Sequence, residues 1–313
     1  MKKYLWIIMS FILLIILVVQ IRALVPLEQQ ITYIYDEREK MPSLSRAYEL
    51  LEEDRDFSML WWTMEGKGKI SCPGLSAEVS CPVVAMAGDI DILIEGANSD
   101  SGSCVLGSET ASRLFGDENV AGLKVSFNGK EYTVRGVSES VKELFAYTKE
   151  SGGDGTFNRL TLAFDDPASK GFIRSKAETL YGPDNLLDHN LICFLLEIVA
   201  AALIIVFAAL ICKTIPENNK KINIILKCAV WASAVLMAIW IIKIPVDFIP
   251  GRWSDFTFWK ELIWSIKEAL NTFISTELSP MDMIWVRKYF AITALEILSA
   301  FSLVLFGVGK RKG

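Results

Sequence analysis

The chain has 313 residues, 52% of them hydrophobic, and its mean hydropathy is +0.35. Its formal net charge of −5 argues against nucleic acid as a partner, because nucleic-acid-binding domains usually carry a basic surface. A single histidine excludes a metal site built from several histidines, and the lack of a G-x-x-x-x-G-K-[ST] loop excludes a P-loop nucleotide site.

Four stretches are apolar and long enough to predict helices that cross a membrane. They are residues 4–21, 191–212, 224–244 and 290–308, each close to or above the ~18–20 residues that a hydrocarbon core of ~30 Å requires. For the first stretch, a cleaved signal peptide is the alternative. A membrane span is favoured there, because the apolar run is long and no A-x-A cleavage site follows it.

The basic residues predict how these spans are oriented. If the spans alternate in direction, one side of the membrane receives Lys2, Lys3, Lys213, Lys220, Lys221, Lys227, Lys310, Arg311 and Lys312. Only Glu217 opposes them. The positive-inside rule then places both termini and the 213–223 loop in the cytoplasm, and residues 22–190 and 245–289 outside. The sequence thus predicts a multi-pass protein of the cell membrane.

Residues 22–190 are numerous enough for one globular domain, and their pattern predicts an α+β fold. Helices are expected at 43–57 and 169–182, and strands at 57–66, 77–86 and 157–164.

The segment GLKVSFNGKEYTVRGV, residues 122–137, predicts a β-hairpin. Asn128-Gly129 is the favoured two-residue type I′ turn, since both positions need positive φ. Such a turn pairs Phe127 with Lys130, Val125 with Tyr132 and Leu123 with Val134. These side chains share one face, so the hairpin is expected to have one side on a core and one side in water.

The stretch GSETASRLFG, residues 107–116, has the strand–turn–helix order that can hold phosphate. A phosphate site needs free amides at a helix N-terminus and usually a nearby cation. No lysine follows the turn, and the predicted location outside the cytoplasm separates it from cellular ATP. We therefore interpret Gly107 and Gly116 as turn and C-cap glycines, with Ser108 as the candidate N-cap.

The segment VLGSETASRLFGDENVAGLKVSFNGKEYTVRGV resembles the extracytoplasmic core domain of ABC transporter permeases of the MacB/FtsX type. The resemblance lies in a strand at Val105-Leu106, a small-residue helix ending in Leu-Phe-Gly at Gly116, a glycine before a strand at Gly122, the Asn128-Gly129 turn, and Val-x-Gly-Val at Val134 to Val137. The order of one span, a large outer domain and three further spans matches as well.

The resemblance implies an α-helical membrane protein with four transmembrane helices and an α+β extracytoplasmic domain between spans 1 and 2. The cytoplasmic N-terminus and first span are then 1–21, and the extracytoplasmic core domain is 22–190. The second span (191–212), a short cytoplasmic loop (213–223) and the third span (224–244) follow. An outer segment with the interfacial helix (245–289) leads to the fourth span and basic tail (290–313). The resemblance implies a permease subunit that couples a separate ABC-type ATPase to the outer domain, for export or mechanotransmission. A second permease, or a second copy of this chain in a homodimer, is a further partner that it allows. The alternative is an accessory or sensor protein that keeps the domain without ATPase coupling.

The cytoplasmic loop between the second and third spans is the segment that the resemblance assigns to ATPase contact. Its candidate residues are Glu217, Lys220, Lys221 and Lys227. The loop is short and lacks the glycine-bearing continuation of the usual coupling helix. The alternative is a plain basic loop that follows the positive-inside rule.

Two acidic residues fall inside predicted spans. Glu197 and Glu296 each lie about six residues from the outer end, roughly 9 Å deep, and Lys243 lies near the outer end of the third span. Charges at such depth normally face the bundle interior or a partner. They are interpreted either as a gate or transmission contact, with Lys243 pairing one glutamate, or as structural, protonated or snorkelling groups.

The 245–289 segment is rich in aromatic residues and predicts an amphipathic helix at 254–276. Such a helix suits the membrane interface, with lipid as its partner. A docking surface for a partner permease or a lipid-like substrate is the alternative. A fifth span is less favoured, because the segment carries several charges.

The extracytoplasmic cysteines allow more than one arrangement. Cys72 and Cys81 can close a small loop if the compartment oxidises thiols, and Cys104 is an equally permitted partner. A zinc site made by the three cysteines is a third option.

No catalytic constellation is visible. His189 stands beside Asp188, but no G-x-S-x-G motif accompanies them, and we interpret the histidine as an interfacial or capping residue. We expect no enzyme activity in this chain and no cofactor.

Overall fold

The computed structural model describes residues 2–24, 27, 29–53, 57–94, 102–150, 155–164, 170–215, 220–245, 248–249 and 256–308. The chain divides into two compact units. The helical unit is built from residues 1–28, 189–256 and 285–313. The sheet domain is built from residues 29–188 and 257–284.

The helical unit contains α1 (Lys2–Arg22), α6 (His189–Cys212), α7 (Lys220–Ile241) and α9 (Met283–Val308). All four helices are long and apolar enough to cross a membrane, as the sequence predicted. Two of them begin earlier than expected: α7 begins at Lys220 rather than at residue 224, and α9 begins at Met283 rather than at residue 290.

Side chains buried in the helical unit recur at alternating steps of three and four residues. On α1 they are Ser10, Leu14, Leu17 and Ile21, and on α9 they include Trp285, Tyr289, Ile292, Glu296, Ser299, Leu303 and Phe306, with Ser302 buried beside Leu303. This spacing is the seam of left-handed helix packing. Outside the seam, large apolar side chains such as Phe290 are exposed. The outer surface of the unit is therefore suited to lipid.

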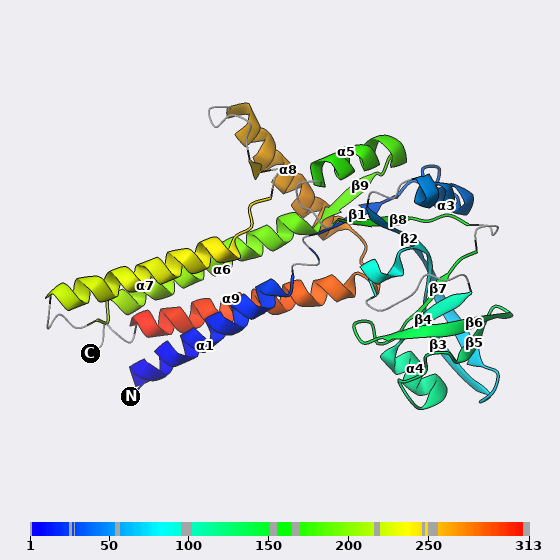
Figure 1. Ribbon diagram of the computed structural model, residues 1–313, viewed down its shortest axis with the longest axis horizontal. Coiled ribbons are helices and arrows are strands. Elements are labelled where there is room, and N and C mark those ends of the chain that lie inside the picture. The colour runs from blue at the N-terminus through cyan, green and yellow to red at the C-terminus, as the bar shows by residue number, and fades with distance from the viewer. Residues whose placement is uncertain are drawn as a thin grey trace. The chain divides into compact units, whose positions relative to one another are not determined.

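Contacts near the helix ends fix the directions of the four helices. The Arg22 guanidinium lies 3.6 Å from the centre of the Trp240 ring, so the C-terminal ends of α1 and α7 meet. His189 at the start of α6 lies 3.1 Å from the Tyr289 hydroxyl near the start of α9. Hence α1 and α7 run one way, and α6 and α9 run the other (Figure 1). The two segments of the sheet domain, 29–188 and 257–284, follow α1 and α7 in the chain and lead into α6 and α9. Both segments therefore connect to the same end of the helical unit.

The described residues of the sheet domain form nine strands in one sheet, in the order β3-β7-β4-β6-β5-β2-β8-β1-β9. The strands are β1 (Gln30–Ile34), β2 (Ser58–Cys72), β3 (Ala77–Gly88), β4 (Ser103–Gly107), β5 (Lys124–Phe127), β6 (Lys130–Ser138), β7 (Phe145–Thr148), β8 (Arg159–Ala163) and β9 (Asn185–Asp188). Because β2 also pairs with β3, the first six strands in this order close into a ring, and β8, β1 and β9 extend from β2.

The helices of the sheet domain are α3 (Leu44–Glu53), α4 (Ser108–Phe115), α5 (Lys170–Tyr181) and α8 (Phe256–Ser275), with a short 3-10 turn at Ile90–Ile92. The expected helices at 43–57 and 169–182 therefore form with trimmed ends, and the expected helix at 254–276 forms as α8. The expected strands at 57–66 and 77–86 form as parts of the longer β2 and β3.

Two adjacent tryptophans on β2 divide the core, because neighbouring strand residues point to opposite faces. Trp61 packs between the rings of Tyr35 and Tyr181, at 5.9 and 5.8 Å, in the cluster that α3 and α5 cover. Trp62 belongs to a second cluster on the other face, which includes Met281 from the segment after α8. The segment before α9 is thus part of the core of the sheet domain.

The predicted hairpin is confirmed. Asn128 and Gly129 have φ values of 50° and 77°, and Phe127 pairs with Lys130 and Val125 with Tyr132. The third predicted pair lies beyond the ladder but is joined by a hydrogen bond from the Val134 amide to the Leu123 carbonyl.

The glycines of the 107–116 stretch have structural roles, as the sequence predicted. Gly116 is the C-cap of α4, with φ of 77°, and its amide donates to the Ser112 carbonyl. At the other end, Gly107 rather than Ser108 is the N-cap. A Cβ atom at Gly107 would lie 2.2 Å from the Lys142 carbonyl oxygen and 2.4 Å from that of Val141. The 141–142 backbone therefore occupies the space where a side chain would stand.

Replacing each glycine by alanine separates these two constraints. Gly116→Ala has free space but an unfavourable φ, and we expect a loss of roughly 1–2 kcal/mol. Gly107→Ala must displace backbone, and we expect a loss of about 3 kcal/mol. Urea unfolding monitored by tryptophan fluorescence measures both values. Equal losses would contradict the close approach at Gly107.

Candidate functional site

Two buried ion pairs hold the residues that directly precede α6 and α9. Asp188 ends β9 just before α6, and its Oδ2 lies 2.9 Å from the Lys170 ammonium. Asp282 precedes α9, and its Oδ2 lies 2.8 Å from the Arg159 guanidinium. The side chains of Lys170 and Asp282 are each 2% exposed, so water screens these pairs little. We call the two pairs the junction pairs.

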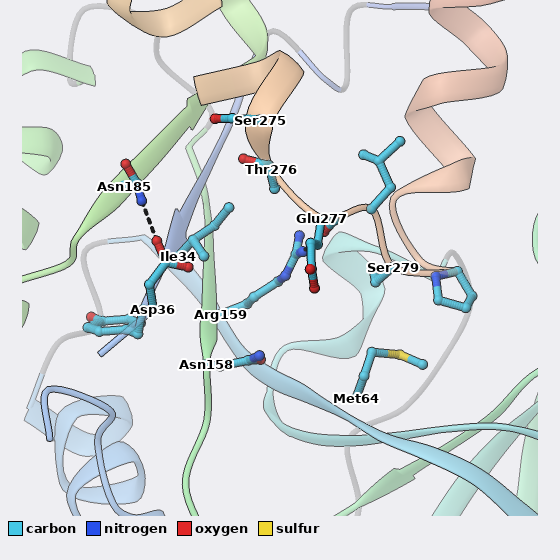
Figure 2. A pocket seen from close by; sticks show the side chains of 13 residues that line it. Ile34, Asp36, Met64, Asn158, Arg159, Asn185, Ser275, Thr276, Glu277 and Ser279 are labelled. Carbon is cyan, nitrogen blue, oxygen red and sulfur yellow. Dashed lines mark hydrogen bonds between the residues drawn. The ribbon is translucent and has the colours of Figure 1, made fainter. Parts of the chain in front are cut away.

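Arg159 makes further contacts that fix the segment between α8 and α9. Its guanidinium also donates to the Glu277 carbonyl at 2.8 Å, and Figure 2 shows it extending from its strand toward Glu277. Asp282 in turn accepts hydrogen bonds from the Ser279 amide at 2.7 Å and the Ser279 hydroxyl at 2.8 Å. A buried ion pair is stable only when such additional bonds satisfy its remaining donors and acceptors.

A row of hydrogen-bonded side chains on the same sheet face supports the Arg159 side chain. Arg159 stands opposite Trp62 in the β2–β8 register, and its guanidinium lies 5.0 Å from the centre of that ring. The Trp62 indole donates to the Thr161 hydroxyl at 3.0 Å, and Thr161 lies 3.2 Å from the Thr32 hydroxyl. The guanidinium is therefore placed by strands β1, β2 and β8 together.

His189 is a packing residue at the start of α6. It is 1% exposed, its Nδ1 lies 3.1 Å from the Tyr289 hydroxyl, and its ring meets the Trp285 ring at 5.1 Å. These contacts join the first turns of α6 and α9 within the helical unit.

The structure brings two of the three intramembrane candidates together. Glu197 is 2% exposed and accepts a hydrogen bond of 2.8 Å from the backbone amide of Lys243. This contact ties α6 to the backbone just after the end of α7. Glu296 is also buried, on the α9 seam, and its Oε1 has no hydrogen-bond partner among the described residues.

The ATPase-contact candidates are described only in part. Lys221 is exposed in the first turn of α7, and Lys227 is half-buried nearly two turns further on, with its carbonyl 3.9 Å from the Cys212 thiol. Lys220 is the first residue of α7, but its side chain lies outside the described residues, as does the whole of Glu217.

The structure does not join Cys72 to Cys81, one of the arrangements that the sequence allows. Both cysteines are free, and the β2–β3 register pairs Cys72 with Ala77 and Cys81 with Gly68. The two residues are therefore separated by about 13 Å along the ladder, beyond the reach of a disulfide. Cys104 is also free, and no group of metal-ligating side chains occurs among the described residues.

No protein-family model matches the chain, and no curated protein matches it. Among the solved structures that are similar to it, two cover half of the chain. The periplasmic region of MacB from Actinobacillus actinomycetemcomitans has 14% identity and a TM-score of 0.37, covering 50% of this chain and 86% of that one. The extracellular domain of the noncanonic ABC-type transporter YknZ from Gram-positive bacteria has 12% identity and a TM-score of 0.36, covering 50% and 96%.

The sequence interpretation missed the junction pairs. One signal was available: Arg159 is a lone charge at the start of the strand run RLTLAF, and Asp282 is a lone charge between two methionines. A charge in such a setting needs a partner when it is buried. Nothing local shows which partner it finds, because 123 residues separate Arg159 from Asp282.

Removing the Asp282 carboxylate tests how much the Arg159–Asp282 pair contributes to the free energy of unfolding. Asp282→Ala leaves a buried guanidinium without its counter-charge, and we expect a loss of about 3–5 kcal/mol. Glu78→Ala is the matched control, because its pair with Lys69 is exposed, and no measurable loss is expected. Urea unfolding of both variants gives the comparison, and similar losses would contradict the buried pair.

The buried thiols are expected to resist alkylation. Burial raises the pKa of Cys81 to about 11 and that of Cys104 to about 12, so little thiolate exists at pH 8. Iodoacetamide should label both cysteines slowly in the native protein and rapidly in urea, as measured by mass spectrometry. A Cys72–Cys81 linked peptide in a non-reduced digest would show that the strand register is different.

Proposed function

We propose that the chain is the permease subunit of an ABC-type transporter, in which a separate cytoplasmic ATPase drives four spans that carry an extracytoplasmic domain. One observation carries the proposal. Both segments of the sheet domain, 29–188 and 257–284, connect to the end of the helical unit where α1 and α7 finish and α6 and α9 begin. A domain inserted at one end of a bundle of spans lies on one side of the membrane.

The basic residues favour the outer side for that domain. Lys213 follows α6, and Lys220 and Lys221 begin α7, all at the end of the helical unit opposite the sheet domain's connections. The positive-inside rule assigns such an end to the cytoplasm. The sheet domain is then extracytoplasmic, and the 213–223 loop is where an ATPase would bind.

The residues that carry the resemblance to MacB/FtsX-type permeases form a continuous structural element. Gly116 ends α4, Asn128-Gly129 turns the hairpin, and β6 runs through Val134 beside β4. Their roles in the fold support an outer domain of the same kind.

The junction pairs supply a path for mechanical coupling. Asp188 and Asp282 are each one residue from the start of a span and are each held by a buried cation of the sheet domain. A displacement of α6 or α9 along its axis would therefore pull on β9 or on β8. Exporting a cargo or transmitting force would use this connection in the same way.

A second candidate is an accessory or sensor protein that has the outer domain without ATPase coupling. The short connection between α6 and α7 favours it: α6 ends at Cys212 and α7 begins at Lys220. This leaves little room for a separate coupling helix.

Charge reversal in the loop distinguishes the two candidates. We expect the full chain, solubilised from its native membrane, to co-purify with an ABC-type ATPase, and Lys220→Glu with Lys221→Glu to abolish this. Repulsion and loss of basic contacts are the physical reason. Lys67→Glu with Lys69→Glu, on an exposed part of β2, is the matched control and should retain the ATPase. Absence of any ATPase from the unaltered chain would favour the accessory protein.

A further inference from the structure

A pocket of about 570 Å³ opens in the sheet domain at the ends of three neighbouring strands. Its floor is formed where β1 ends and where β8 and β9 begin, and its rim is the segment after α8, as Figure 2 shows. The lining includes Asp36, Asn158, Asn185, Thr276 and Glu277. The volume lies within the roughly 300–1,000 Å³ that is typical of small-molecule sites.

Both walls of the pocket are held in place by polar contacts within the sheet domain. The Arg159–Asp282 pair fixes the rim through the Glu277 carbonyl. On the other wall, the amides of Asp36 and Glu37 donate to the Asp184 carboxylate at 2.9 and 3.0 Å. The amide of Glu37, followed by the Lys40 ammonium, holds the pKa of Asp184 below its usual range. A pocket with fixed walls loses little entropy when it binds a ligand.

The charges of the lining favour a cation. Asp36 and Glu277 contribute carboxylates from the two sides, and both residues are exposed. Among the described residues of the lining, Arg159 is the only cationic one, and its charge is already compensated by Asp282. The pocket therefore carries an excess of negative charge that a ligand can neutralise.

The uncharged lining groups favour a ligand that also forms hydrogen bonds. Asn185 donates to the Asp36 carboxylate and so leaves the second Asp36 oxygen for another donor. The Asn158 Oδ1 is buried beside the pocket and has no hydrogen-bond partner among the described residues. Ser275 and Thr276 add hydroxyls to the rim, and Met64 and Pro280 add apolar surface.

We propose that this pocket binds a small organic cation, of guanidinium or ammonium type and up to the size of a dipeptide. One carboxylate, from Asp36 or Glu277, pairs with the positive group, and the amide and hydroxyl groups of the lining bind the polar part of the ligand. The site needs only the sheet domain's own residues, so it does not depend on whether an ATPase drives the spans.

Two probes that differ only in charge test the proposal. The full chain in lipid nanodiscs is titrated by calorimetry with Nα-acetylated argininamide and with its neutral isostere, Nα-acetylated citrullinamide, called argininamide and citrullinamide below. We expect argininamide to bind with a Kd below about 1 mM and citrullinamide to bind at least about tenfold more weakly. Raising the salt concentration should weaken argininamide alone.

Conservative variants locate the binding. Asp36→Asn and Glu277→Gln keep the side-chain shape, and the variant that removes the pairing carboxylate should weaken argininamide binding about tenfold. Glu118→Gln removes an exposed carboxylate outside the pocket and should leave the affinity unchanged. Equal affinity for the two probes, no binding of argininamide at about 1 mM, or binding that survives both pocket variants would overturn the proposal. Co-purification of an ATPase is measured separately, so the two proposals fail independently.

Discussion

The buried guanidinium of Arg159 is the constraint on which the arrangement of the sheet domain depends. A side chain that is 7% exposed cannot keep a positive charge without a counter-charge, and that charge comes from Asp282. The pairing brings the segment after α8 onto the sheet, where Met281 enters the core beside Trp62. What would otherwise be a linker between two helices is thereby made part of the domain, and it also forms the rim of the pocket.

The same solution appears where the chain leaves the domain for α6. Lys170, at the start of α5, is 2% exposed and pairs with Asp188 at the end of the edge strand β9. In both cases the cation belongs to the interior of the domain, and the aspartate is the residue next to a long helix. Apolar residues of similar volume at these positions would often stabilise a domain as much as the ion pairs do. A charge pair differs because it ties the position to one particular partner.

Local patterns predicted local structure well. Turn chemistry at Asn128-Gly129 and the lengths of the apolar runs were sufficient for the hairpin and for the four long helices, because each depends on neighbouring residues alone. Features set by distant strands were not predictable in this way. The ring closed by β2 and β3, the register that separates Cys72 from Cys81, and the partner of Arg159 all depend on pairings that the sequence does not mark.

The last span differs from the others in how it is held. At one end α9 follows Asp282, which the sheet domain fixes, and toward the other end its Ser302 hydroxyl lies 2.6 Å from that of Ser10 on α1. Between these points the seam carries Glu296 and Ser299 in place of apolar residues. Polar groups at such depth bind neighbouring helices more specifically than apolar packing does. Movement of α9 relative to α1 would therefore break the defined contact between the Ser10 and Ser302 hydroxyls.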